Sequence, residues 1–270
     1  MTKRELQYKE IFFFQRSGQL IIDNISDYNI FGIRFINGSY IDAMERLRNG
    51  GFMVVPSAPG LATLGSDLQY TKAVQNSDFA IPDSGFMVLL YRIFKGKRIR
   101  KLSGAMFIKL FVNEPFLKDK NKIFLVDPNI EESKLNHNYL NGVGIPLSRK
   151  NQYIAPIYDK TAIVDTQLLY ILENLKEKPK FILINLGSGV QERLGYYLKN
   201  YLSFTTGIIC SGAAIAFLTG AQAKMPNWVE KIYCGWLCRI IQNPKQYTMR
   251  YIKAFKLIYI FYLEKRGVFL

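Results

Sequence analysis

The 270-residue sequence is poor in the residue types on which several common chemistries depend. It contains three cysteines and one histidine. Cys210, Cys234 and Cys238 show neither metal-ligand nor redox spacing, so we expect reduced thiols. His137 lies in a polar stretch without a neighbouring nucleophile, and we predict a surface loop there. These absences argue against a zinc site, a disulfide scaffold and a Ser-His-Asp mechanism.

Acidic residues and long apolar runs are also scarce. Lys and Arg number 36 against 21 Asp and Glu, which gives a formal net charge of +15. That sign favours nucleic acid, anionic lipid head groups or phosphorylated substrates. No RNP-type aromatic motif or helix-turn-helix signature is found, so we expect no nucleic-acid partner. No apolar run reaches about 18 residues and the N-terminus has no signal-like segment, which predicts a cytoplasmic protein with peripheral membrane contact only.

Short apolar runs alternate with helical patterns, which predicts an α/β fold with a largely parallel sheet flanked by helices. The helices that we expect are 39–48, with Ser39 as N-cap, then 67–75, 86–94 and 165–177. The strands that we expect are 33–36, 52–55, 79–81, 123–126, 181–186 and 207–210.

The composition changes after Pro226, which predicts three segments: an N-terminal extension (1–30), an α/β domain (31–226) and a C-terminal appendage (227–270). Residues 229–270 carry eight basic and two acidic side chains among many aromatic ones. If 245–265 were one continuous helix, its cations would share one face spanning about 140°. That composition is typical of a helix lying in a membrane interface. The alternative is a terminal helix that packs on the core with solvated lysines.

Three turns, 55–60, 82–85 and 187–192, follow predicted strands, where ligands gather in a parallel α/β sheet. In the second turn, Asp83 is either a general base or a helix N-cap. The third turn, 187–192, offers glycines and free backbone amides for a phosphate, or it simply needs positive φ angles. It is neither a G-x-G-x-x-G motif nor a P-loop. The basic run 95–101 is a solvated loop or a contact for a diphosphate.

Taken in order, these turns and the basic tail resemble the WecG/TagA/CpsF glycosyltransferases, glycosyltransferase family 26, over about 31–265. The resemblance is carried by the following residues: Pro82-Asp83, Leu186-Gly187 with Gln191-Glu192, Gly212 and Gly220 with Lys224 and Pro226, and Trp236-Leu237 with Arg239 and Asn243-Pro244.

The resemblance implies a Rossmann-like, inverting and metal-independent enzyme without a cofactor. Such an enzyme moves an N-acetylmannosamine-type hexose from UDP to an undecaprenyl-diphosphate-linked sugar for cell-surface polysaccharide, at the inner face of the membrane. Asp83 matches the family's base. Donor-binding positions are Ser57, Gly187, Gln191 and Glu192. Positions for the acceptor diphosphate or the membrane are Lys101, Arg239, Arg250 and Lys253.

The sequence departs from the family pattern at Val55, Asp127, Ala216 and Gly235, where a Thr, a glycine-rich turn, an Asp and a Glu are usual. Two interpretations follow: an active transferase with altered donor contacts, or an inactive member that acts as a membrane-bound scaffold. A basic nucleic-acid binder is the third hypothesis. The aromatic tail also leaves self-association into a homo-oligomer open.

Overall fold

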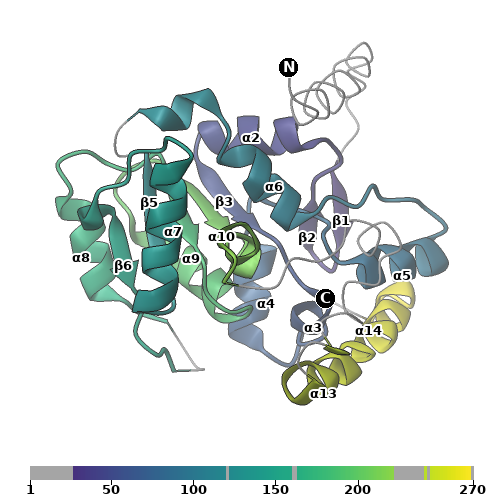
Figure 1. Ribbon diagram of the computed structural model, residues 1–270. Helices are drawn as coiled ribbons and strands as arrows, with labels where there is room; N and C mark the ends of the chain where they lie inside the picture. Colours follow the sequence, from purple (N-terminus) through teal and green to yellow (C-terminus); the bar gives the residue numbers. More distant parts are fainter. Residues whose placement is uncertain (1–26, 120–121, 160–162, 222–239, 242–243, 269–270) are drawn as a thin grey trace, which may run out of the picture.

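The computed structural model describes residues 27–119, 122–159, 163–221, 240–241 and 244–268. One eight-stranded sheet runs through the centre with helices on both faces (Figure 1). The strand order is β1-β2-β4-β3-β8-β7-β5-β6. The strands are β1 (Tyr28–Ile30), β2 (Ile33–Phe35), β3 (Gly51–Val54), β4 (Phe79–Ala80), β5 (Ile123–Asp127), β6 (Gln152–Ile154), β7 (Phe181–Ile184) and β8 (Gly207–Cys210).

Every strand pair is parallel except β1 with β2. The predicted α/β fold is therefore confirmed. The sheet begins at Tyr28, inside the segment that the sequence analysis assigns to an extension, because β1 pairs with β2 in a hairpin. The rest of that extension lies outside the described residues.

The buried strands contribute alternate side chains to two cores, as a sheet covered on both faces requires. Phe52 and Val54 of β3 enter one core, whereas Met53 and Val55 enter the other. The helices of the first core are α3 (Ala58–Leu61), α4 (Leu68–Gln75), α5 (Gly85–Lys95), α8 (Thr166–Asn174), α9 (Val190–Tyr201), α13 (Pro244–Ala254) and α14 (Lys256–Lys265). Those of the second core are α2 (Tyr40–Arg48), α6 (Gly104–Phe111) and α7 (Ile130–Gly142), with α10 (Ala216–Thr219) beside it.

Local capping fixes where several helices begin. The side chains of Ser39, Asp67 and Asp165 accept hydrogen bonds from the backbone amides three residues on, at the starts of α2, α4 and α8. Each satisfies an amide that the helix itself leaves free. The predicted helix starts are thus confirmed, but His137 lies within α7 and not in a loop.

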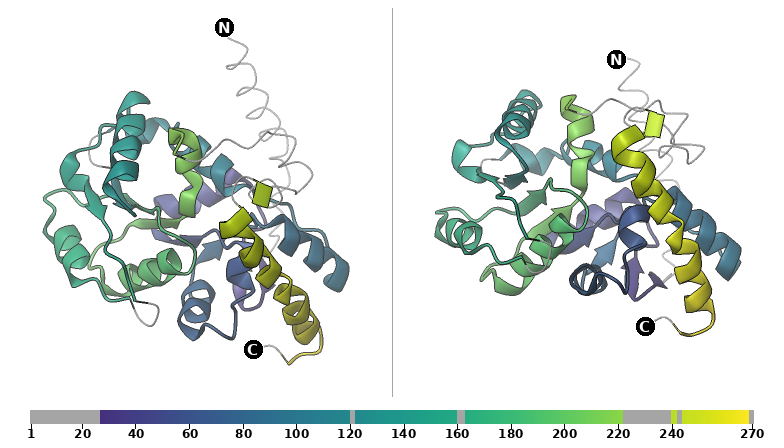
Figure 2. Two further views of the ribbon diagram at one scale, coloured as in Figure 1. Left: turned by 60° about the horizontal axis from the view of Figure 1, so that its bottom comes forward. Right: turned by 90° about the horizontal axis from the view of Figure 1, so that it is seen from below.

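The tail forms two consecutive helices, α13 and α14, with only Phe255 between them. The single continuous helix assumed for 245–265 is therefore interrupted. Helix α13 packs against α3 and helix α14 against α5, and Figure 2 shows the two tail helices following one another along one side of the molecule. Ala254, Leu257, Ile260 and Phe261 are buried in the first core, so this part of the appendage packs on the α/β domain.

Candidate functional site

The carboxyl ends of four central strands bring the sequence-predicted turns to one edge of the sheet. Ala80 of β4 pairs with Val54 of β3, which pairs with Cys210 of β8, which pairs with Ile184 of β7. Asp83 follows β4 and Gly187 follows β7, so both lie at this edge, three strand spacings apart. At about 4.8 Å per spacing, that separation is about 14 Å.

The Asp83 side chain is partly exposed, and a hydrogen bond fixes one of its carboxylate oxygens. Its Oδ1 accepts a hydrogen bond from the backbone amide of Gly104, at 3.1 Å. Ser84, not Asp83, is the N-cap of α5, because its Oγ accepts the Met87 amide. The alternative of a plain N-cap is therefore wrong. In the described part of the chain, no side chain donates a hydrogen bond to Oδ2 of Asp83.

The start of α6 links Asp83 to the end of β3, because Gly104 donates its amide to Asp83 and also packs against Val55. A Cβ on Gly104 would lie 2.8 Å from Cγ1 of Val55, so a larger residue would push α6 away from the end of β3. Two residues beyond Val55, Ser57 caps α3 by accepting the Gly60 amide at 3.3 Å. Asp83 and Ser57 thus belong to one assembly at the ends of β3 and β4.

The turn at 187–189 is occupied by internal hydrogen bonds. The Gly189 amide donates to the Glu192 carboxylate at 2.6 Å, and the amides of Val190 and Gln191 both donate to the Gly187 carbonyl. The expectation that these three amides are free for a phosphate is therefore wrong. Gly189 has φ +93°, which agrees with the alternative of a turn that needs positive φ.

Glu192 lies beneath this turn with no exposed surface. Burial raises the pKa of its carboxyl group, although hydrogen bonds from Gln191 and Gly189 oppose that shift. Gln191 is buried too. Its Nε2 donates to Glu192 at 3.0 Å and its Oε1 accepts the Gly212 amide at 2.6 Å. Gln191 therefore ties the turn after β7 to the turn after β8.

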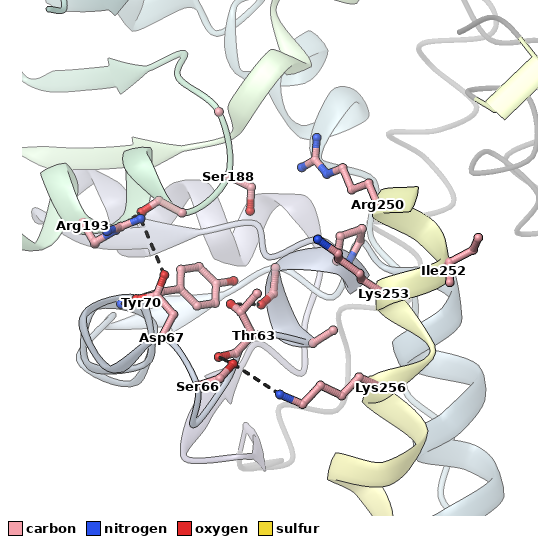
Figure 3. A pocket seen from close by; sticks show the side chains of 15 residues that line it. Thr63, Ser66, Asp67, Tyr70, Ser188, Arg193, Arg250, Ile252, Lys253 and Lys256 are labelled. Atoms are coloured by element: carbon pink, nitrogen blue, oxygen red, sulfur yellow. Dashed lines mark hydrogen bonds and ion pairs between the residues drawn. The ribbon is translucent and has the colours of Figure 1, made fainter. Parts of the chain in front are cut away.

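A cavity of about 620 Å³ opens beside this turn, between α3, α4 and the tail helices. Figure 3 shows Arg250 and Lys253 reaching toward it from α13. Of the predicted site residues, Gly187, Arg250 and Lys253 line this cavity, while Asp83, Ser57, Gln191, Glu192 and Lys101 do not. Arg239 and Gly235 lie outside the described residues.

The lining residues that were not predicted as site residues include four with polar or charged side chains that could bind a ligand: Tyr70, Ser188, Arg193 and Lys256. They come from α4, the turn, α9 and α14, so no local motif joins them. The only sequence signal was the helical spacing of Lys256 with Arg250 and Lys253, and all three do face the cavity (Figure 3).

The cavity is strongly cationic. Arg193 pairs with Asp67, the one acid in the lining, at 3.6 Å. Lys256 donates to Ser66 Oγ at 3.4 Å. No carboxylate in the described ranges forms an ion pair with Arg250 or Lys253. Uncompensated cations facing a cavity favour an anionic ligand.

The tail helices also present an apolar surface to solvent. Met249, Ile252, Phe255, Tyr259 and Tyr262 are each more than two-fifths exposed. On the adjoining helix α5, large apolar side chains are exposed as well. Among the described residues, no helix is long and apolar enough to cross a membrane, and no group of three His, Cys, Asp or Glu could hold a metal ion.

A largely parallel α/β sheet binds ligands beyond the carboxyl ends of its strands, and the cationic cavity found there favours an anionic ligand. The sequence matches the WecG/TagA/CpsF glycosyl transferase family over residues 28–268. The chain belongs to this family and is a glycosyltransferase. It is also similar to the N-acetylglucosaminyldiphosphoundecaprenol N-acetyl-beta-D-mannosaminyltransferase of Bacillus subtilis (strain 168), with 22% identity over 224 residues, which cover 80% of this chain and 83% of that protein.

Proposed function

We propose that the protein transfers an N-acetylmannosamine-type hexose from a UDP-sugar to a sugar linked to undecaprenyl diphosphate, for cell-surface polysaccharide. The family and the name of the Bacillus relative support the acceptor class and the sugar type. The single structural observation that carries the proposal is the partly exposed Asp83 carboxylate at the ligand-binding edge of the sheet, with one oxygen anchored and the other available.

In this proposal Asp83 is the general base. The Gly104 amide fixes one carboxylate oxygen, and the other takes the proton from the attacking acceptor hydroxyl. The hydroxyl oxygen forms a bond to the anomeric carbon as the bond to the UDP oxygen breaks, and UDP leaves with that electron pair. A single displacement on the face opposite the leaving group inverts the anomeric configuration.

The donor would lie along the edge between Ser57 and the turn at Gly187. Two departures from the family pattern fall in this region. Val55 and Ala216 are both buried, with 8% and 2% exposure, so neither supplies a polar contact at the surface of the edge. We infer that the donor sugar differs from that of typical family members. The loss of polar side chains at these two positions also favours the second candidate, an inactive scaffold.

The tail would bind the acceptor's diphosphate. Arg250 and Lys253 face the cavity without carboxylate partners in the described ranges, and the resemblance adds Lys101 and Arg239. Side-chain cations can neutralise phosphate charge as a metal ion would, which supports a metal-independent reaction without a cofactor. The exposed apolar surface of α13 and α14 would rest on the inner face of the cell membrane.

The test is turnover of UDP-N-acetylmannosamine with N-acetylglucosamine linked through diphosphate to a short prenyl chain. We expect a disaccharide of inverted anomeric configuration by NMR, at a rate that EDTA leaves unchanged. UDP binding by calorimetry without turnover of any UDP-hexose would support the scaffold instead. Binding of nucleic acid in preference to anionic liposomes would contradict both.

A further inference from the structure

The cavity has a feature that its positive charge does not explain: two hydroxyl groups without protein partners. Tyr70 is fully buried, and its Oη has no hydrogen-bond partner among the described residues. The same holds for Ser188 Oγ in the turn after β7. A buried hydroxyl without a partner carries a desolvation cost, so its retention calls for a ligand.

The two hydroxyls converge on the same space. A Cβ on Gly60 would lie 2.7 Å from Tyr70 Oη and 2.8 Å from Ser188 Oγ, so both oxygens lie against this glycine, close to the same point. Figure 3 shows them pointing inward from α4 and from the turn, opposite the cations of the tail helices. Burial raises the pKa of the Tyr70 phenol well above its usual value, although the neighbouring Ser188 hydroxyl opposes that shift, so the phenol stays protonated and can donate.

The composition of the walls indicates the ligand class. Hydroxyl donors on one wall and Arg250, Lys253 and Lys256 on the other suit the oxygens of a diphosphate. Ile252 lines the same cavity and is 54% exposed, so the cationic wall continues directly into the apolar surface of the tail. A ligand that joins a diphosphate to a hydrocarbon chain matches both surfaces.

The position of the cavity relative to Asp83 fits a ligand whose diphosphate lies in the cavity and whose sugar extends toward Asp83. Helix α3 connects the cavity with the region around Asp83. Its N-cap Ser57 lies two residues after Val55, which packs against Gly104, the residue whose amide bonds to Asp83. Pro59 and Gly60 of the same helix line the cavity.

We propose that Tyr70 and Ser188 bind the glycosyl diphosphate of the lipid-linked acceptor, as hydrogen-bond donors opposite the tail cations. This assignment rests on the proposed function. A UDP-sugar contains the same glycosyl diphosphate group, but it lacks the hydrocarbon chain that the adjoining apolar surface would accommodate.

The experiment measures binding by calorimetry, with farnesyl-diphosphate-linked N-acetylglucosamine and with UDP as separate probes. Tyr70→Phe and Ser188→Ala each remove one hydroxyl and little else. We expect each to weaken binding of the lipid-linked probe about 10-fold. UDP binding should stay within about twofold of wild type. The melting temperature should change little, because neither hydroxyl meets the geometric criteria for a hydrogen bond to any residue that the structure describes.

The matched control is Tyr153→Phe. Tyr153 Oη donates to Asp165 at 3.0 Å, away from the cavity. This variant should melt at a lower temperature and bind the lipid-linked probe as wild type does. Unchanged binding of that probe by both cavity variants would overturn the proposal, as would weaker binding of UDP.

The readout is independent of catalysis. Hydroxyl-dependent binding of the lipid-linked probe together with full turnover by Asp83→Asn would uphold this site and refute the proposed base. Loss of turnover in Asp83→Asn with unaltered binding in Tyr70→Phe and Ser188→Ala would uphold the proposed base and refute this site.

Discussion

The carboxylate of Glu264, near the end of the last helix, accepts a hydrogen bond from the backbone amide of Phe31 at 3.1 Å, across 233 residues of sequence. Its other oxygen pairs with Lys95 at 3.2 Å. Next to this contact, Phe261 packs edge-to-face on Phe31, with ring centroids 4.6 Å apart. Together these contacts fix α14 on the sheet and thereby hold the cations of the tail over the cavity.

We expect Glu264→Ala to loosen the tail. It leaves the Phe31 amide without its partner and Lys95 without its counter-ion, at a cost of about 1 to 3 kcal/mol. Hydrogen exchange of α14 should become about 10-fold faster or more, while exchange in β5 and β7 should not change. In Glu264→Gln, whose side chain can still accept the Phe31 amide, α14 should exchange at a rate between those of wild type and Glu264→Ala. Equal exchange in all three proteins would show that other contacts hold the tail.

Removing a cavity cation should affect the acceptor selectively. Lys253→Ala is expected to raise the KM for the lipid-linked acceptor about 10-fold, because a charge-assisted contact to phosphate is lost. The difference should shrink as salt screens the charge. Lys245→Ala is the matched control, since Lys245 is an exposed lysine of the same helix outside the cavity lining. Equal effects of the two changes would refute a specific role for Lys253.

The exposed surface of the tail should govern attachment to lipid. The double change Met249→Ser and Tyr259→Ser removes apolar area that is 60% and 57% exposed. Binding to anionic liposomes in a flotation assay should weaken at least 10-fold, given about 1.5 to 3 kcal/mol for each large side chain that becomes buried. Leu68→Ser, at a 73% exposed position on α4, should bind as wild type. If Leu68→Ser lowers binding as much, the surface is not specific.

The buried Asp127 should make stability depend on pH. Burial raises the pKa of its carboxyl group, while hydrogen bonds from Asn185 and Asn136 oppose the shift. Among the residues that the structure describes, Asp127 Oδ2 and Asn185 Oδ1 have no hydrogen-bond partners. Asn185 Nδ2 donates to Asp127 Oδ1 at 2.7 Å. A proton on Oδ2 would provide a donor for the free oxygen of Asn185.

The raised pKa means that the folded chain keeps a proton that the unfolded chain loses above about pH 3.9. This contribution to stability is present below that pH and is lost as the pH rises through the folded-state pKa. Asp127→Asn carries a permanent N–H donor, so its free energy of unfolding relative to wild type should increase from pH 4 to pH 8. The increase should be about 1.4 kcal/mol per unit of raised pKa. Urea titrations at several pH values measure it, with the exposed Asp119→Asn as a flat control. A pH-independent difference for Asp127→Asn would contradict a buried titrating group.

Much of the fold could be predicted because its causes are local. The apolar runs of β5, β7 and β8 are short and continuous, which is typical of strands covered on both faces. Ser39, Asp67 and Asp165 cap helices by bonding to amides three residues away, so their role can be recognised in the sequence. His137 shows the limit: its polar neighbourhood suggested a loop, but α7 is a helix with a largely polar exposed surface.

The site could be predicted only in part, because its groups converge from distant segments. The order of turns placed Asp83 and Gly187 at one edge, which the parallel register explains. Nothing local marks Tyr70, which lies on an ordinary helix and reaches Ser188 only after α4 and α9 pack together. The occupation of the Gly189 amide by Glu192 was equally hidden, since a turn with glycines has the same sequence whether its amides are free or bonded.

If Asp83 removes the proton from the acceptor hydroxyl, the turnover of Asp83→Asn must fall. Asparagine can still accept the Gly104 amide through Oδ1, so folding, UDP affinity and acceptor affinity should stay within about twofold of wild type. We expect kcat to fall by about 100- to 10,000-fold. A kcat equal to that of wild type, in a variant that is folded and binds both substrates, would contradict it.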